Sequence, residues 1–448
     1  MKKIPKTDSI PFNWIELGKD PRSFFTSRVL KHKEIIDVGF FPGLGTYLLC
    51  DPEYIEHVLV KNNKNYKKAK SYEPVKLLLG NGLLTSDGEF WKRQRRIAQP
   101  AFHKKVLAGF TDAITEIVEE LCLQWEKQLA QGREELNIAD EMMKLTVRIT
   151  SRLLFGADIA NKEERIIFLI GELNESTIKM LKIPLMIPLW IPTPNNFKFT
   201  KYRKEIYGIV NEIITKRRNI KDTNNEDLLQ MLMDARDEET GEGMSDEQLR
   251  DEVLTLFLAG SETSSNALSW TLYLFNKQRD KEEIARNEMD TIIDKGLTGL
   301  EAMREMRYLS LCMQESMRIY PPAWFISREA IHEDNIDGYV IPKKSQLYIS
   351  IHGMHNHPEY WGDPENFRPE RFEEEHSRPK YAYFPFGGGP RLCIGAELAR
   401  MEILMTLFKL LERFRFRNSD ENVKPEALIT LRPKNGLKMK IFGNCLSC

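Results

Sequence analysis

The stretch that decides the fold is FPFGGGPRLCIGAELAR, residues 384–400, in which one cysteine stands between a run of glycines and an amphipathic segment. The pattern after Cys393 is that of a helix, which we expect to start at Cys393 or just after it. A thiolate at a helix N-terminus is stabilised by the helix dipole and by unpaired backbone N–H groups, which favours metal ligation or nucleophilic attack. The glycines at 387–389 and Gly395 permit positive φ and the close approach of a flat ligand. An inert buried thiol in an ordinary glycine loop is the plain alternative.

Composition excludes some classes of function. The chain has 448 residues, 42% of them hydrophobic and 29% charged, with a net charge of −1. These values are typical of a globular protein, and the near-zero charge gives no bulk attraction to nucleic acid. No repeat and no linker-like stretch divides the sequence, so we expect a single domain over residues 1–448 and a monomer.

The sequence predicts no transmembrane anchor and a cytoplasmic location, because no uninterrupted apolar window of about 18 residues and no signal peptide occurs. The most apolar stretch, residues 178–194, contains four prolines and would make a poor spanning helix. It is either a surface loop near a membrane or a substrate entrance, or a buried loop. Cys445 and Cys448 form a lone CxxC, a weak zinc signal that we interpret as a reduced tail.

The order of patterns along the chain indicates a mainly α protein with a smaller β portion. Asp51 followed by Pro52 predicts the capped start of a helix. We expect β-rich segments at about 30–50, 325–350 and 427–442, and helical segments over 89–320 and 393–415.

Residues 245–276 predict one long helix through the core, with Ser245 and Gln248 forming a capping box at its start. The middle of this apolar helix nevertheless carries Gly260 and Glu262. A central glycine costs about 1 kcal/mol and a buried carboxylate costs more unless it is paired. Such breaks in local rules are often functional, but close helix packing at the glycine and a buried hydrogen bond to the acid would explain them equally well.

The positions around Cys393 form the pattern Phe386-x-x-Gly389-x-Arg391-x-Cys393-x-Gly395, which resembles the haem-binding signature of the cytochrome P450 family. The resemblance extends from about residue 20 to residue 442 and implies the fold of that family. Four further motifs resemble those of the family and follow its order: Trp91-x-x-x-Arg95, Ala259-Gly260-x-Glu262-Thr263, Glu315-x-x-Arg318 and Pro369-Glu370-Arg371-Phe372.

The resemblance implies haem b (iron protoporphyrin IX) with the Cys393 thiolate as axial ligand, because a thiolate donates electron density to the iron and favours O–O cleavage. Glu262 and Thr263 are then the candidates for relaying protons to dioxygen. Glu315, Arg318 and Arg371 are implied to form a buried structural network that supports the haem loop. The remaining candidates for haem contact are Trp91, Arg95, Ala259, Arg328, His355, Phe386, Gly387, Arg391 and Gly395.

Substrate contacts are also implied by the resemblance, which draws them from the loop around residues 71–84 and from apolar side chains elsewhere. Such a pocket accepts a lipophilic molecule, of fatty-acid, terpenoid or steroid type. The side chains concerned are Leu256, Ala259, Ala323, Trp324, Phe325 and Ile429.

We expect the chain to take its electrons from a separate ferredoxin or flavodoxin with its reductase. A basic cluster at Lys92, Arg93, Arg95, Arg96, Lys104 and Lys105 either attracts such an acidic partner or is a solvated helix face. Three rival functions are a peroxide-driven haem-thiolate enzyme, a haem sensor or lipophile carrier without turnover, and a cysteine hydrolase. Glu262 and Thr263 favour the monooxygenase, no output domain is visible for a sensor, and Cys393 lacks an evident base for a hydrolase.

Overall fold

The structure is a computed structural model that describes residues 2–7, 10–40, 43–156, 162–181, 187–219, 227–373, 378–419 and 422–444. The chain divides into two compact units. Unit 1 comprises residues 1–70, 118–142 and 263–448, and unit 2 comprises residues 71–117 and 143–262. The single domain expected from the sequence stays a prediction, and each unit is described by itself. Cys445 and Cys448 lie outside the described residues.

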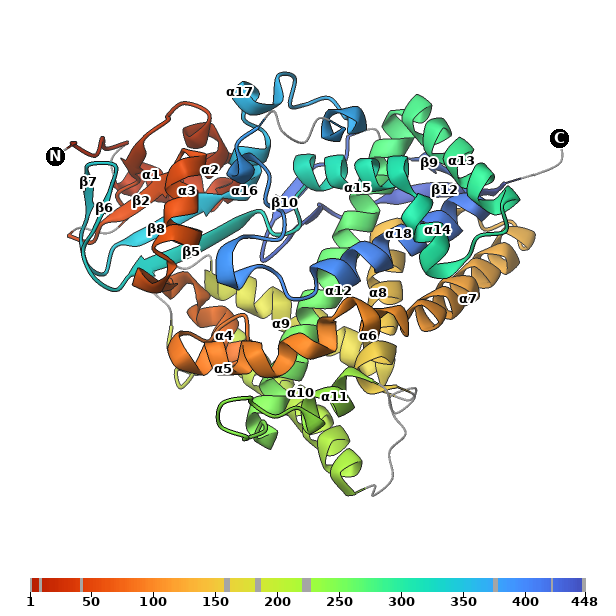
Figure 1. Ribbon diagram of the computed structural model, residues 1–448, viewed down its shortest axis with the longest axis horizontal. Helices are drawn as coiled ribbons and strands as arrows, with labels where there is room; N and C mark the ends of the chain where they lie inside the picture. The colour runs from red at the N-terminus through yellow and green to blue at the C-terminus, as the bar shows by residue number, and fades with distance from the viewer. Residues whose placement is uncertain are drawn as a thin grey trace. The chain divides into compact units, whose positions relative to one another are not determined.

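Unit 1 holds every described strand, together with nine helices of its own (Figure 1). Its helices are α1 (Ile10–Lys19), α2 (Pro21–Val29), α3 (Pro52–Glu56), α13 (Arg279–Asp294), α14 (Gly299–Glu305), α15 (Arg307–Ile319), α16 (Ile351–His355), α17 (Pro358–Trp361) and α18 (Ala396–Arg413). Its strands are β1 (Ile35–Asp37), β2 (Thr46–Leu49), β3 (Tyr66–Lys68), β4 (Glu135–Asn137), β5 (Phe325–Ala330), β6 (Asp334–Ile336), β7 (Tyr339–Ile341), β8 (Gln346–Ser350), β9 (Phe414–Asn418), β10 (Pro425–Ala427), β11 (Leu431–Pro433) and β12 (Lys438–Gly443).

Unit 2 contains helices joined by turns and loops, and none of the described strands. It contains α4 (Glu73–Leu79), α5 (Gly88–Ala98), α6 (Lys104–Ala108), α9 (Glu163–Leu181), α10 (Pro194–Asn219) and α11 (Leu228–Asp234). Three long helices pass from one unit into the other along the chain: α7 (Thr111–Ala130), α8 (Ile138–Phe155) and α12 (Asp246–Lys277). The prediction of a mainly α protein with a smaller β portion is confirmed.

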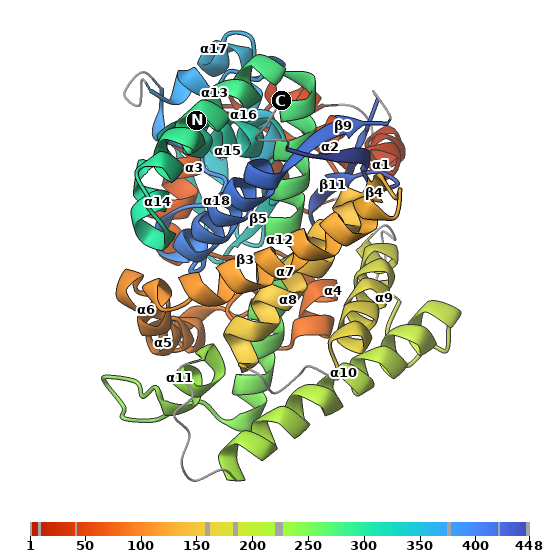
Figure 2. The ribbon, with the colours of Figure 1, turned by 90° about the vertical axis from the view of Figure 1, so that its right-hand side faces the viewer.

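The main sheet of unit 1 has five strands in the order β1-β2-β8-β5-β3. Only the β2–β8 pair is parallel; its register places Tyr47 opposite Leu347. The core beneath this sheet is aromatic: the ring of Phe25 lies 4.6 Å from that of Phe325 and 5.6 Å from that of Tyr348. Helices α2 and α16 pack on each other at this core, and α18 packs beside α13, α14 and α15 (Figures 1 and 2).

Two helix starts confirm the capping signals in the sequence. The side chain of Asp51 accepts the N–H of Glu53 at 2.7 Å, with Pro52 as the first residue of α3. At the start of α12 the N–H of Ser245 donates to Gln248 Oε1 at 2.9 Å, and the N–H of Gln248 donates to Ser245 Oγ at 3.3 Å. These bonds satisfy backbone donors that have no partner within the helix.

Within the proline-rich stretch, residues 187–194 are half-buried or exposed, whereas Ile178 and Met180 belong to the end of α9 and are buried. Trp190 is 82% exposed, and Phe197 in the first turn of α10 is 72% exposed. Asn196 is buried beneath them and donates through Nδ2 to the carbonyls of Pro188, at 2.9 Å, and Ile191, at 3.0 Å. The surface interpretation therefore holds for residues 187–194, while a place near a membrane or a substrate entrance stays a prediction. Among the described residues, no helix combines the length and the apolar character needed to cross a bilayer.

Candidate functional site

Cys393 lies in a turn of unit 1 that precedes α18. The helix starts at Ala396, three residues after Cys393, with Gly395 as its N-cap. The backbone N–H of Cys393 donates to the carbonyl of Phe386 at 3.0 Å, which closes the turn. This geometry presents the thiol outward from a fixed backbone.

The thiol of Cys393 is exposed, whereas those of Cys50, Cys122 and Cys312 are buried. Burial raises the pKa of Cys122 to about 12 and raises those of Cys50 and Cys312 as well, which holds them as inert thiols. Among the cysteines that the structure describes, Cys393 is therefore the one placed to act as a ligand.

Two glycines of the cysteine turn adopt the predicted left-handed backbone, Gly387 at φ +74° and Gly389 at φ +66°. Gly388 and Gly395 do not, with φ values of −164° and −88°. A Cβ on Gly389 would collide with the carbonyl oxygen of Leu59, while a Cβ on Gly387 would meet nothing within 4 Å. Gly389 is thus required for packing inside unit 1, and Gly387 leaves open space beside the turn.

The predicted structural network is present and buried. Arg318 donates to Glu315 through Nε at 2.7 Å and through Nη2 at 2.8 Å, and both side chains are 0% exposed. Arg371 adds a bond from Nε to Glu315 Oε1 at 3.0 Å. Arg318 also binds the backbone of α16: its Nη1 donates to the carbonyl of His355 at 2.9 Å. The network therefore joins α15 to the chain that precedes the cysteine turn.

His355 continues this connection instead of contacting a propionate. Its Nε2 accepts the N–H of Phe384 at 2.9 Å, and its Nδ1 lies 3.3 Å from the carbonyl of Met317. Burial lowers the pKa of His355 to about 3, so the ring is neutral, with its proton on the nitrogen that faces the carbonyl. Because backbone groups use both ring nitrogens, the predicted haem contact of His355 does not fit; the residue positions Phe384, two residues before Phe386.

The surroundings of Arg328 show whether unit 1 offers a partner for a haem carboxylate. This β5 side chain is only 5% exposed and donates through Nη1 to the carbonyl of Ser327 at 2.8 Å. Within the described ranges it forms no ion pair with a carboxylate. A buried guanidinium is costly without an anion, so Arg328 calls for a carboxylate from outside the chain. Together with the exposed thiol and the open space at Gly387, this donor set fits haem; Phe386 and Arg391, in the cysteine turn itself, are half-buried.

The central part of α12 is buried except along one face. From Asp251 to Phe275 every residue is buried except Leu256, Ala259, Gly260 and Thr263. These four follow the spacing i, i+3, i+4 and i+7, which places them on one face of a helix. They include three of the positions predicted for substrate contact and oxygen chemistry.

Both plain explanations for the polar centre of α12 hold in unit 2. A Cβ on Gly260 would lie 3.2 Å from Thr150 Oγ1 on α8, so the glycine permits close packing. Glu262 is 5% exposed and accepts a hydrogen bond from Asn174 Nδ2 of α9 at 3.0 Å. Thr146 of α8 also donates to the carbonyl of Ser261 at 2.9 Å. The acid is held by a defined partner, and this is compatible with a role in proton transfer.

Trp91 and Arg95 belong to α5 of unit 2, four residues apart and so on one face of that helix. Trp91 is buried and Arg95 half-buried. The structure describes them with unit 2, and their predicted contact with haem stays a prediction.

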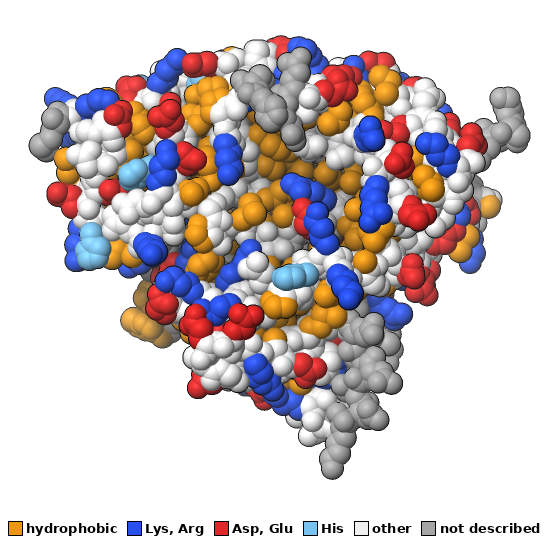
Figure 3. All heavy atoms as spheres, viewed as in Figure 1, with side chains coloured by type: hydrophobic (Ala, Val, Ile, Leu, Met, Phe, Trp, Pro, Cys, Tyr) orange, Lys and Arg blue, Asp and Glu red, His pale blue; other side chains and the backbone are white. Residues whose placement is uncertain are grey.

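The basic cluster of α5 is largely paired within unit 2. Arg93 binds Glu242 at 2.8 Å, and Arg96 binds Asp237 at 2.8 Å and Glu239 at 2.7 Å. Figure 3 shows basic and acidic side chains interspersed over one face of the molecule. The pairing removes much of the charge on which docking of an acidic partner would depend, and therefore favours the solvated-face interpretation for these two arginines.

The predicted substrate segments differ in how they are built. Half of residues 71–84, expected as a loop, is helix α4 (Glu73–Leu79); a short 3-10 helix (Lys70–Tyr72) precedes it, and a turn follows from Gly80 onward. Trp324 donates its indole N–H to the carbonyl of Leu428 at 3.0 Å, and its ring lies 5.3 Å from that of Phe325 in the sheet core. The structure thus brings residues 323–325 beside the turn that holds Ile429, but the Trp324 ring serves the core.

The buried polar residues that were not identified from the sequence include two that bind side chains of α12. One is Asn174, which lies in an ordinary amphipathic pattern on α9 and has no local signal. The other is Glu402 of α18, which accepts a hydrogen bond from Ser264 Oγ at 2.8 Å; burial raises its pKa to about 8. Its place in the apolar run MEILMTLF, residues 401–408, was the signal available for burial.

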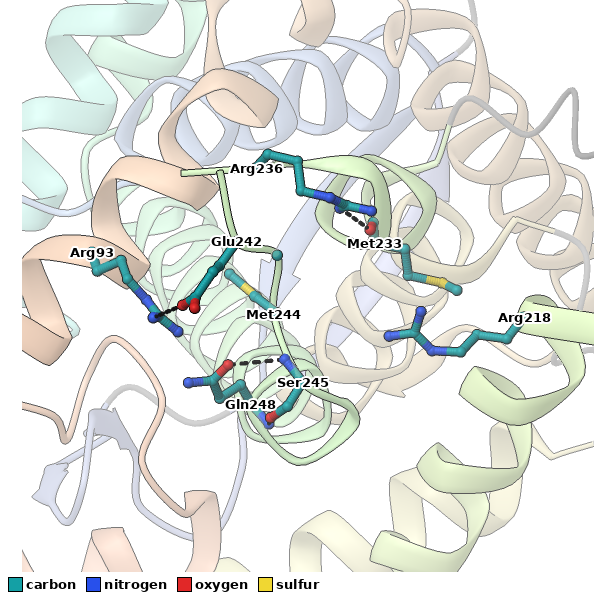
Figure 4. Close-up of a pocket in the computed structure, with 9 residues that line it drawn as sticks. Arg93, Arg218, Met233, Arg236, Glu242, Met244, Ser245 and Gln248 are labelled. Atoms are coloured by element: carbon teal, nitrogen blue, oxygen red, sulfur yellow. Dashed lines mark hydrogen bonds and ion pairs between the residues drawn. The ribbon is translucent and has the colours of Figure 1, made fainter. Parts of the chain in front are cut away.

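A separate hollow of about 580 Å³ lies in unit 2 and contains none of the predicted site residues (Figure 4). Three arginines line it, and each has a partner: Arg93 binds Glu242, Arg218 binds Asp246 at 2.6 Å, and Arg236 donates to the carbonyl of Met233 at 2.8 Å. Each arginine of this hollow therefore already has a hydrogen-bond or ion-pair partner within unit 2.

Comparison with known proteins agrees with this site. The family described as cytochrome P450 matches residues 5–441. A cyclooctat-9-en-7-ol 5-monooxygenase of Streptomyces melanosporofaciens is 32% identical over 405 residues, which cover 90% of this chain and 86% of the relative. A cyclooctatin synthase of the same organism is 30% identical over 404 residues, with the same coverage. Cytochrome P450 CYP72A616 of Paris polyphylla is 33% identical over 407 residues, 87% of this chain and 78% of the relative. The chain belongs to the cytochrome P450 family and is a monooxygenase of that family.

Proposed function

We propose that this enzyme inserts one oxygen atom of dioxygen into a C–H or C=C bond of a lipophilic molecule. The second oxygen atom leaves as water, and the balance requires two electrons from a separate ferredoxin or flavodoxin and two protons. The observation that carries the proposal is the accessible face of α12, where apolar Leu256 and Ala259 share one side of the helix with Thr263. An apolar surface with one polar group suits a lipophile that must be oriented and then oxidised.

Haem b is the proposed cofactor, with Cys393 as its thiolate ligand and Arg328 as a partner for one of its carboxylates. When bound, it supplies the iron at which dioxygen is activated, and a thiolate ligand favours O–O cleavage. The residues of the chain then have distinct tasks. The Cys393 turn holds the sulfur in place through the bond from its N–H to Phe386, and the network of Glu315 and Arg318 fixes the backbone before that turn.

Proton delivery is proposed for Thr263 and Glu262. Thr263 is half-buried on the accessible face, so its hydroxyl can hold a water molecule and donate a proton there. Glu262 is buried beside it in the chain and is oriented by Asn174. A carboxyl held in one orientation can return a proton to the hydroxyl after each transfer, which is what repeated turnover requires.

The substrate class proposed is a terpenoid or another lipophile of similar size. Support comes from two of the relatives, whose names describe a cyclooctat-9-en-7-ol monooxygenase and a cyclooctatin synthase.

The test combines spectroscopy with turnover. Reduced protein under carbon monoxide should show the red-shifted Soret band of a thiolate-ligated haem. Addition of NADPH, a ferredoxin and its reductase should then convert a bound lipophile to a product that carries one oxygen atom from labelled dioxygen. Turnover with hydrogen peroxide alone, and none with the electron-transfer proteins, would show the peroxide-driven enzyme instead. Haem binding without any turnover would show the sensor or carrier.

A further inference from the structure

The turn between α4 and α5 is bound by two neighbouring acids of α12, all within unit 2. Asp251 Oδ2 accepts the N–H of Asn81 at 2.7 Å, and Glu252 Oε2 accepts the N–H of Leu83 at 3.0 Å. The two acids are only 4% and 1% exposed. Buried carboxyl groups are costly unless they are hydrogen-bonded, so their position on α12 demands a partner such as this turn.

Two glycines let the turn lie directly on the helix. Gly80 has φ +67°, and a Cβ there would fall on the carboxylate of Asp251. Gly82 has an ordinary φ, but a Cβ there would collide with Thr255 Oγ1 and lie 2.8 Å from the carbonyl oxygen of Asp251. The sequence Gly-Asn-Gly is therefore required by the space available as well as by the backbone conformation at its first residue.

A third helix holds the end of α4 from the other side. Tyr207 of α10 donates its hydroxyl to the carbonyl of Leu78 at 3.0 Å. The guanidinium of Arg250 lies 4.4 Å from the centre of the Tyr207 ring, and its Nη2 donates to Asp251 Oδ1 at 2.8 Å. Asp251 is thus fully bonded, and α4 with its turn is connected to both α10 and α12.

The position of these acids on α12 links the turn to the accessible face. Leu256 and Ala259 follow Glu252 by four and seven residues, which is the spacing of one helix face. We propose that Asp251 and Glu252 are positioning residues that fasten the Gly80–Thr85 turn to α12 and so determine the shape of lipophile that the enzyme admits. The fastening stands on contacts within unit 2, whereas its effect on substrates rests on the proposed function.

The chemistry of Glu252 suggests the conservative substitution. Burial raises the pKa of Glu252 to about 8, so at neutral pH its side chain is mainly the neutral acid. Its Oε1 has no hydrogen-bond partner among the described residues. An amide has the same shape and keeps one acceptor for the N–H of Leu83, so Glu252→Gln should retain the bond that Glu252→Leu removes.

Hydrogen exchange in the full-length protein as purified tests the fastening. In Glu252→Leu the peptide that covers residues 80–86 should exchange its amides at least tenfold faster, because the N–H of Leu83 loses its acceptor. Gly82→Ala should do the same by displacing the turn, and it gives a second variant should Glu252→Leu not fold. Two control variants should exchange these amides at the wild-type rate. One is Glu252→Gln, and the other is Gly171→Ala, at an exposed glycine of α9 where a Cβ meets nothing within 4 Å. Unchanged exchange in both test variants would overturn the fastening.

Ligand shape tests the second half of the proposal. Two imidazoles, 1-dodecylimidazole and 4-phenylimidazole, are titrated against the haem spectrum of each variant. In Glu252→Leu and Gly82→Ala the ratio of the two dissociation constants should change at least fivefold, while Glu252→Gln and Gly171→Ala keep the wild-type ratio. Faster exchange with an unchanged ratio would overturn the effect on ligand shape. A wild type without haem would instead overturn the proposed function, and the exchange comparison would still decide the fastening.

Discussion

Asn174 Nδ2 of α9 donates to Glu262 Oε2 of α12 at 3.0 Å, and both side chains are buried. We predict that Asn174→Leu lowers the fraction of consumed NADPH that appears as product by at least twofold, because Glu262 loses the partner that orients it. The measurement is product formed against NADPH consumed. Asn195→Leu is the matched control, since it removes the bond from an asparagine of α10 to the carbonyl of Ser176. Equal coupling in both variants would show that Asn174 has no part in orienting the acid.

Thr263→Ala should uncouple the reaction more strongly than it slows it. The variant keeps the apolar surface of α12 but removes the hydroxyl that donates protons, so oxygen consumption should continue while product falls several-fold and peroxide accumulates. Thr263→Ser, which restores the hydroxyl, should recover most of the coupling. Product yield that stays at the wild-type level in Thr263→Ala would remove Thr263 from the proposed relay.

Cys393→Ser should abolish the red-shifted Soret band of the reduced carbon-monoxide complex, because an alcohol does not supply the thiolate. Cys312→Ser is the matched control, at a buried thiol of α15 with 0% exposure. It should retain the band even where it costs stability. If the band survives in Cys393→Ser and disappears in Cys312→Ser, the thiolate ligand is Cys312 and the proposed assignment to Cys393 is wrong.

The ion pair of Glu315 and Arg318 should contribute far more to stability than a surface pair of the same spacing. Glu315→Ala leaves a buried guanidinium unpaired, which costs roughly 3 to 5 kcal/mol in the free energy of unfolding. Glu412→Ala removes the partner of Lys409, 2.9 Å away on α18 with both side chains about a quarter exposed, and should cost less than about 1 kcal/mol. Urea unfolding of the two variants measures the difference, and equal losses would contradict the structural role.

Glu402 should make the protein less stable as pH rises. Its pKa is raised by burial from 4.5 to about 8, so between these values the folded protein holds a proton that the unfolded chain has released. The folded state then binds more protons, and the free energy of unfolding falls as pH increases through this window. Glu402→Gln should lose less stability between pH 5 and pH 8 than the wild type, by more than about 1 kcal/mol. Glu412→Gln, on the same helix, is the control. If it alters the pH dependence of the free energy of unfolding by the same amount, the effect comes from the loss of one negative charge and not from the burial of Glu402.

Features that depend on neighbours along the chain were predictable from the sequence. The capping box at Ser245 and the cap at Asp51 satisfy backbone donors two or three residues away, so the residues concerned are adjacent in the sequence. The cysteine turn with its glycines is equally local. Residue spacing also places Leu256, Ala259 and Thr263 on one side of α12, although only the packing shows that this side is accessible.

Partners far apart in the sequence were decided by the tertiary structure alone. His355 was expected at a propionate but binds the backbone at Phe384 and Met317, since burial leaves no other acceptor or donor for its ring. Arg96 finds its acids 141 and 143 residues further along the chain, which no local pattern reveals. The fastening of Leu83 by Glu252 spans 169 residues. The physical reason is common to these cases: a buried polar group must find a partner, but which one it finds depends on how distant segments pack.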